Sequence, residues 1–159
     1  MSEQAFRYEP AADHPGWFTW NLTDETRFNA QTMGRMLTRI EDRADGARVA
    51  RLRMFPERRH SNLLDAVHGG VTLALIDISL FAAMRTLLDG DAAGSVTLDL
   101  STQFIGAGKI GQPLDAVVEV LRETGRLVFL RGLVVQGDDT IAAFNGTIRK
   151  PTQRNQTAR

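Results

Sequence analysis

A run of eighteen residues, from position 71 to position 88, limits most strongly what this chain can fold into. Thirteen of these residues are apolar, and Asp77 lies near the middle of the run. A helix that is apolar nearly all round is either the core helix of a globular domain or a membrane span. A central Asp costs about 2.5–3.5 kcal/mol on insertion into a bilayer. We therefore predict a core helix over residues 69–88, stopped by the turn at residues 89–91.

The pattern on either side of this helix has a period of two. In one segment, Val96, Leu98 and Leu100 alternate with polar residues. Residues 26–45 carry a loose helical pattern, and the later part of this segment is alternatively a strand. The strands expected from alternation are residues 48–55, 95–104, 114–121, 127–135 and 140–150.

These elements predict an α+β fold, with an antiparallel sheet of five to six strands curled around one long central helix. The length of 159 residues suits one domain. We divide the chain into an N-terminal arm (residues 1–30), a domain (31–150) and a polar C-terminal tail (151–159). The aromatic residues of the arm are expected to dock it onto the domain, and a functional lid is the alternative.

Composition excludes several classes of function. Nineteen basic and nineteen acidic residues balance, so no nucleic-acid partner is expected. There is no cysteine, which excludes disulfides and thiolate chemistry, and no histidine pair has metal-ligand spacing, so no metal is expected. Residues 1–8 lack the regions of a secretory signal. We expect a cytoplasmic protein that does not bind a membrane.

The loop before the core helix ends in His68-Gly69-Gly70. A Gly-Gly pair at a helix start leaves backbone N–H groups free, and these groups, with the helix dipole, favour an anion or a polarised carbonyl oxygen. The missing side chains let a substrate approach closely. This is the chemistry of an oxyanion hole, and a tight turn is the alternative.

Asp77 is a carboxylate in apolar surroundings, where burial is costly unless something compensates. It is either paired structurally or it acts as a general base or nucleophile. Thr97 either orients Asp77 or a water molecule, or is an ordinary strand threonine.

The remaining polar residues allow more than one role each. His68 can position the loop or substrate, transfer a proton, or pack. Asn62 can bind substrate or shape a turn. Lys109 and Arg126, both in predicted turns, can bind phosphates or remain solvated. His14 and His60 are interpreted as incidental.

Helix geometry separates His68 from Asp77. Nine residues of helix correspond to about 13 Å of rise and about half a turn of rotation. The two residues of one chain should therefore not meet around one reacting atom. A two-fold dimer would bring Asp77 of one chain to Gly69 of the partner subunit, and would form two equivalent sites.

This set of residues resembles the hotdog-fold acyl-CoA thioesterases of the PaaI-like group. The resemblance centres on Asn62, on His68-Gly69-Gly70 and on Asp77, with the asparagine six residues before the histidine and the acid nine after it. It covers about residues 30–150, and it extends with lower specificity through residues 96–99, Gly111 and residues 125–126.

The resemblance implies a homodimer, often paired into a homotetramer, with sites at the subunit interface. Asp77 would be the nucleophile or general base, and the Gly69 N–H would polarise the thioester carbonyl. Asn62, His68 and Thr97 would assist. The residues implied in substrate binding are Gly70, Gly106, Lys109 and Arg126. Neither a metal nor a separate cofactor is implied, since CoA is part of the substrate.

Three positions depart from the pattern of the group. Asp65 stands where glycine is common, although Asp tolerates left-handed backbone better than most residues. Gly106-Ala107 replaces the usual Pro-Ala, and Gln112 stands where an acid is common. The expected function is hydrolysis of an acyl-CoA to the free acid and CoA. The alternatives are a non-catalytic acyl-CoA-binding or regulatory module, and a hotdog dehydratase or hydratase, whose His-Phe-Pro-Gly type of motif this chain lacks.

Overall fold

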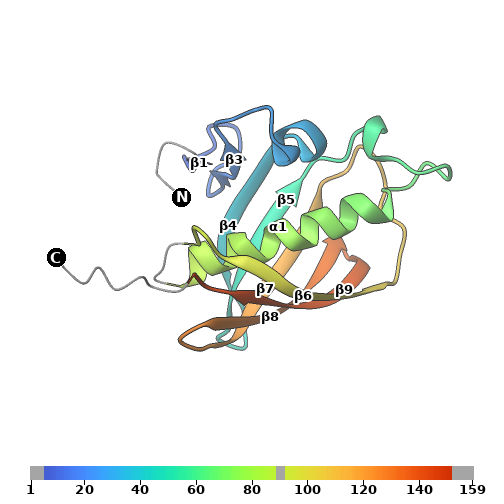
Figure 1. Ribbon diagram of the computed structural model, residues 1–159. Helices are drawn as coiled ribbons and strands as arrows, with labels where there is room; N and C mark the ends of the chain where they lie inside the picture. The colour runs from blue at the N-terminus through green and yellow to red at the C-terminus, as the bar shows by residue number, and fades with distance from the viewer. Residues whose placement is uncertain (1–5, 89–91, 152–159) are drawn as a thin grey trace.

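The computed structural model of the chain describes residues 6–88 and 92–151 (Figure 1). Seven antiparallel strands form one sheet in the order β2-β4-β5-β7-β8-β9-β6. Its strands are β2 (Phe18–Thr19), β4 (Met36–Asp42), β5 (Arg48–Met54), β6 (Val96–Phe104), β7 (Leu114–Glu123), β8 (Leu127–Gln136) and β9 (Asp139–Arg149). A separate small sheet pairs β1 (Phe6–Arg7) with β3 (Asn21–Leu22).

The long apolar segment is helix α1 (Gly69–Leu87), and the sheet curls around it (Figure 1). Leu75, Ile76 and Leu80 of α1 are fully buried in one cluster with inward-facing residues of the sheet such as Leu52 and Val118. By length and composition α1 is apolar enough to cross a membrane, a test that core helices also pass. The fold is therefore the hotdog arrangement that the resemblance implies, and the predicted helix and the five predicted strands are confirmed. The predicted stop at residues 89–91 lies outside the described residues.

The helical pattern over residues 26–45 is largely wrong as a prediction of helix. Only a single turn is helical, the π-helix η2 (Asn29–Met33), and Gly34 ends it with a φ of 69°. The later part is strand β4, as the alternative stated. Met36, Leu37 and Thr38 at the start of β4 are all buried, so the strand shows no alternation there. With the two-residue β2, this strand brings the sheet to seven strands instead of five to six.

The N-terminal arm covers the outer face of β4. Trp17 is buried with Leu37, and the guanidinium groups of Arg39 and Arg53 each lie 4.4 Å from the centre of its ring. Trp20 is also buried and meets Phe6 edge to face at 4.3 Å. Both faces of β4 are therefore covered, one by the core and one by the arm. This explains why apolar and polar residues do not alternate along its sequence.

Gly132 in the middle of β8 is a site where a side chain does not fit. A Cβ there would lie 2.3 Å from the carbonyl oxygen of Val117 and 2.5 Å from Cζ of Phe144. We expect Gly132→Ala to lower the free energy of unfolding by about 1–3 kcal/mol through overpacking, measured by urea denaturation. Gly125→Ala is the matched control, because nothing lies within 4 Å of its added Cβ. Equal effects of the two substitutions would contradict this account.

Candidate active site

The loop between β5 and α1 is shaped by Asn62. Its side-chain Oδ1 accepts hydrogen bonds from the backbone N–H groups of Leu64 (2.8 Å) and Ala66 (3.2 Å). Its own backbone N–H donates to the carbonyl oxygen of Ala66 at 2.8 Å. Asp65 has a φ of 57°, so the left-handed turn survives without glycine. The turn-shaping role predicted as an alternative for Asn62 is thus present in the structure.

His68 caps the N-terminus of α1. Its Nδ1 accepts the N–H of Gly70 at 2.9 Å, and its carbonyl oxygen accepts the N–H groups of Val71 and Thr72. The N–H of Gly69 has no acceptor within residues 6–88 and 92–151. Since the first N–H groups of a helix carry its positive end, Gly69 offers one free donor with the polarity that an oxyanion needs. The ring of Phe104 borders this donor, 3.5 Å from the position of a Cβ on Gly69.

Asp77 lies two turns further along α1 and is half-buried in the single chain. The hydroxyl of Thr97 donates to its Oδ1 at 2.7 Å. A bulge between Thr97 and Asp99 shifts the register of β6 against β9, and Thr97 faces the helix. Of the two predictions for Thr97, the bond to Asp77 is therefore present.

The turn-rich segment after β6 lies beside the loop that carries His68. The N–H of Val67 donates to the carbonyl oxygen of Gly108 at 2.8 Å, and Ala66 forms a β-bridge with Lys109. Gly106 leaves no room for a side chain, because a Cβ there would lie 2.8 Å from the carbonyl oxygen of Thr140. The side chain of Lys109 is exposed at this end of the molecule.

Arg126 lies at the opposite end of the sheet from Lys109. It belongs to the turn between β7 and β8, where its carbonyl oxygen accepts the N–H of Lys150. Strand β6 begins at this end and runs to the other (Figure 1). The predicted residues thus fall into two groups within one chain. The first group is Asn62, His68, Gly69, Gly70, Gly106 and Lys109, and the second is Asp77, Thr97 and Arg126.

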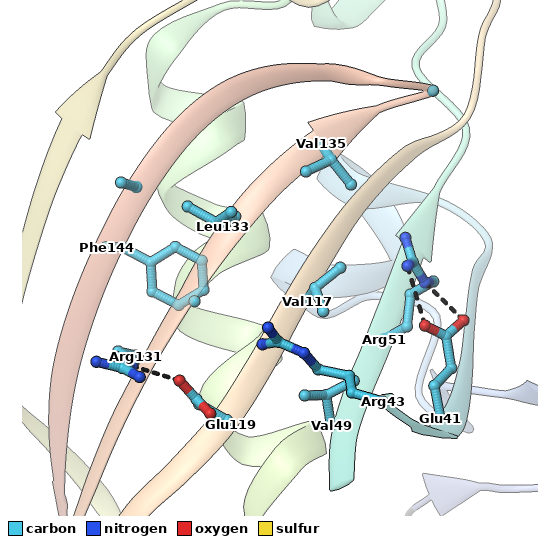
Figure 2. Close-up of a pocket in the computed structure, with 13 residues that line it drawn as sticks. Glu41, Arg43, Val49, Arg51, Val117, Glu119, Arg131, Leu133, Val135 and Phe144 are labelled. Carbon is cyan, nitrogen blue, oxygen red and sulfur yellow. Dashed lines mark hydrogen bonds and ion pairs between the residues drawn. The ribbon is translucent and has the colours of Figure 1, made fainter. Parts of the chain in front are cut away.

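One groove lies elsewhere, on the face of the sheet that turns away from α1 (Figure 2). It has a volume of about 620 Å³, and Arg43, Arg51, Arg131, Val117 and Leu133 are among the side chains that line it (Figure 2). No residue predicted for the site lines it. Among the described residues, no three side chains of His, Asp or Glu are placed to hold a metal ion.

The charged side chains of this groove form ion pairs with one another or with neighbouring residues. Arg51 donates to Glu41 from Nε at 2.8 Å and to Asp115 from Nη1 at 3.1 Å (Figure 2 shows the pair with Glu41). Burial alone would raise the pKa of Glu41, but hydrogen bonds from Arg51 and Arg39 lower it below its ordinary value. The carboxylate is therefore held ionised beside its arginines, as in a structural ion pair.

Two residues near the site were not predicted. Phe104 borders the Gly69 donor, and His60, interpreted as incidental, is 2% exposed and hydrogen-bonded at both ring nitrogens. Phe104 could have been predicted from its position, because it is an aromatic residue at the end of a strand and directly before a turn-rich segment. No local pattern marks His60, because one of its two partners lies 28 residues away in the chain.

Comparisons with known proteins find relatives of this chain. A family model described as "Thioesterase superfamily" matches residues 64–143, about half of the chain. Acyl-coenzyme A thioesterase 13 of Mus musculus is 32% identical over 77 residues, which are 48% of this chain and 53% of the mouse protein. The Homo sapiens protein of the same name is 28% identical over 76 residues, again 48% of this chain and 53% of the relative. The chain thus spans about half the length of the curated relatives it matches.

Solved structures share the fold over most of the chain. A conserved protein of Pseudomonas aeruginosa, 26% identical, superposes with a TM-score of 0.64 over 79% of this chain and 94% of that chain. The PaaI protein of E. coli, from the phenylacetic acid degradation operon, is 19% identical and has a TM-score of 0.63, covering 80% of this chain and 87% of that chain. Likeness at the latter identity concerns the fold alone.

Proposed function

Since this chain belongs to the thioesterase superfamily, we propose that it hydrolyses acyl-CoA thioesters to the free acid and CoA. One observation carries the proposal. The chain contains two groups that thioester hydrolysis needs. One is the Asp77 carboxylate, which accepts a hydrogen bond from the Thr97 hydroxyl, and the other is the free N–H of Gly69 at the N-terminus of α1. The similarity to acyl-coenzyme A thioesterase 13 supports the substrate class.

The chemistry follows from these groups. Thr97 occupies Oδ1 of Asp77, and within the described residues Oδ2 accepts no hydrogen bond, which leaves this oxygen free to act on water or on the thioester carbon. As a general base, Asp77 removes a proton from water, the water oxygen bonds to the carbonyl carbon, and the C–S bond then breaks to release the CoA thiol. As a nucleophile, Asp77 bonds to the carbonyl carbon itself and the C–S bond breaks to release CoA; water then hydrolyses the resulting anhydride, which frees the acid and restores the Asp77 carboxylate. In either case the Gly69 N–H stabilises the oxyanion.

A homodimer is part of the proposal, because one chain does not bring the two groups together. Eight residues of helix separate Gly69 from Asp77, which corresponds to about 12 Å. Strand β6 is at the edge of the sheet and pairs only with β9 in the part of the chain that the structure describes. A strand of nine residues with one open edge is a natural template for a second copy, and Val96, Leu98 and Phe104 along it are exposed.

Antiparallel pairing of two β6 edges would reunite the two groups of predicted residues. The end of one chain that carries Gly69 and Lys109 would then lie beside the region of the other that carries Asp77, Thr97 and Arg126. We propose that Lys109 and Arg126 bind the phosphates of CoA from the two sides of this interface, and that Asn62, His68 and Gly70 shape its loop. The reaction as proposed uses no metal or separate cofactor.

Two such dimers are proposed to associate through the outer face of the sheet. Leu121, Phe129 and Leu133 are exposed there although they are large and apolar. The ion pair between Arg131 and Glu119 flanks them (Figure 2). An apolar patch bordered by charges of both signs suits contact with a second copy. A cytoplasmic location stays a prediction.

The proposed activity is tested with a panel of aromatic, short-chain and medium-chain acyl-CoAs and a thiol reagent that detects released CoA. The chain has no cysteine, so the reagent reports only on the product. We expect CoA release with at least one member of the panel. Tight binding of an acyl-CoA without release would instead favour the non-catalytic binding module. If no acyl-CoA is bound and none is hydrolysed, both functions are overturned.

A further inference from the structure

His60 ends the 3₁₀ turn η3 (Arg58–His60), which precedes the loop of the candidate active site. The backbone N–H of Glu57 donates to its Nδ1 at 2.7 Å, and Nε2 lies 2.7 Å from the carbonyl oxygen of Thr32. An amide N–H only donates and a carbonyl oxygen only accepts. The buried ring is therefore neutral, with its proton on Nε2, and both nitrogens are used.

The backbone of His60 connects this ring to the start of α1. Its carbonyl oxygen accepts the N–H of His68 at 2.8 Å. The β-bridge between Ser61 and Val67, the residues next to His60 and His68, closes the loop beside this bond. His68 is the N-cap of α1, and the next residue is Gly69. One residue thus joins a buried anchor to the backbone that carries the proposed oxyanion donor.

The anchor lies in a firmly held part of the chain. Thr32 belongs to η2, whose Met33 is 1% exposed in the core. Arg59 makes a second link from the same turn, since its Nη1 donates to the carbonyl oxygen of Gln31 at 2.7 Å. Here the carbonyl groups of η2 serve as the fixed end of the loop.

We propose that His60 is a positioning residue: through its Nε2–H tautomer it holds the base of the loop, and with it the Gly69 N–H, at the place where the thioester carbonyl oxygen binds. The proposal rests on the proposed thioesterase function. Removing the ring leaves the Glu57 N–H and the Thr32 carbonyl unpaired and frees His68 to shift. Catalysis is sensitive to such shifts, because a displacement of about 1 Å costs up to about 10²-fold in rate.

The test compares His60→Ala, His60→Asn and two controls in the full chain. We expect His60→Ala to lower kcat by about ten- to a hundredfold with KM changed much less, since binding groups elsewhere remain. His60→Asn, whose Oδ1 can replace Nδ1 as acceptor for Glu57, should recover part of the loss. The control His14→Gln alters a histidine that packs on Phe55 and contacts neither Glu57 nor Thr32, the two partners of the His60 ring. Val118→Ala creates a buried core defect in β7, and neither control should change kcat.

Two readouts do not depend on turnover. Nitrogen NMR of the wild-type ring should show a proton-free Nδ1 and a protonated Nε2. Hydrogen exchange at the His68 amide should be slow in the wild type and fast in His60→Ala, but unaffected in Val118→Ala. Wild-type kcat in His60→Ala, a loss no larger than in Val118→Ala, or a ring protonated at Nδ1 would each overturn the proposal. If no acyl-CoA is hydrolysed by the wild type, the thioesterase function fails, while the NMR and exchange results still decide whether His60 anchors the loop.

Discussion

Asp77→Asn is expected to lower kcat by about 10²–10⁴-fold, the usual contribution of a general base, while leaving the fold intact. Asn has the shape of Asp, and its Oδ1 can still accept the Thr97 hydroxyl that now lies 2.7 Å away. The substitution therefore removes the negative charge and the basic oxygen and little else. KM should change far less than kcat, because the carboxylate acts on the reacting atoms and not on the CoA moiety.

The measurement is steady-state release of CoA, with circular dichroism and thermal melting to show that the variant is folded. Asp99→Asn is the matched control. This residue lies two positions beyond Thr97 on the same strand, after the bulge, where it is opposite Thr147 of β9. Its side chain is exposed. It should retain wild-type turnover. Hydrolysis at the wild-type rate by Asp77→Asn would sink the proposed mechanism.

Much of the fold was predictable because the strongest sequence signal matches the strongest physical requirement. The run around α1 is apolar on nearly every side, and a sheet that surrounds the helix is the economical way to bury it. The start of α1 at Gly69 was equally predictable from the Gly-Gly pair. Strand β4 was not, because Leu37 packs against Trp17 of the arm while its neighbours face the core. A strand covered on both faces loses the alternation by which strands are recognised.

The candidate site divides in the same way. Asp77 was recognisable as a carboxylate out of place, and Thr97 as the polar residue of the neighbouring strand. His60 was not recognisable, because it acts through main-chain groups of Glu57 and Thr32, and main-chain partners leave no trace in side-chain patterns. Spacing along α1 indicated that His68 and Asp77 need two chains, yet only the position of β6 at the sheet edge indicates which surfaces would meet.

Gly69→Pro is the second substitution with a large expected effect, a loss of about 10²–10³-fold in kcat for one oxyanion donor. Proline removes the N–H of Gly69, and it is tolerated at the first position of a helix. The preceding residue, His68, already has the extended backbone that proline requires, with a φ of −63° and a ψ of 137°. Gly69→Ala is the control that keeps the N–H, and its Cβ would make an ordinary 3.5 Å contact with Phe104. A Gly69→Pro variant as active as Gly69→Ala would exclude the donor role.

The two inactive variants together test whether each site is built from two chains. If Asp77 of one chain works with Gly69 of the partner subunit, a mixed dimer of Asp77→Asn and Gly69→Pro has one site with both defects and one site with neither. Random exchange of subunits in an equal mixture makes half of the dimers mixed, so about a quarter of all sites become intact. Activity should therefore rise from nearly zero to about a quarter of the wild-type value once the subunits have exchanged. The measurement is the rate of CoA release after the two variants are refolded together. If both residues instead served a site within one chain, every site in the mixture would keep one defect, and co-refolding would restore nothing.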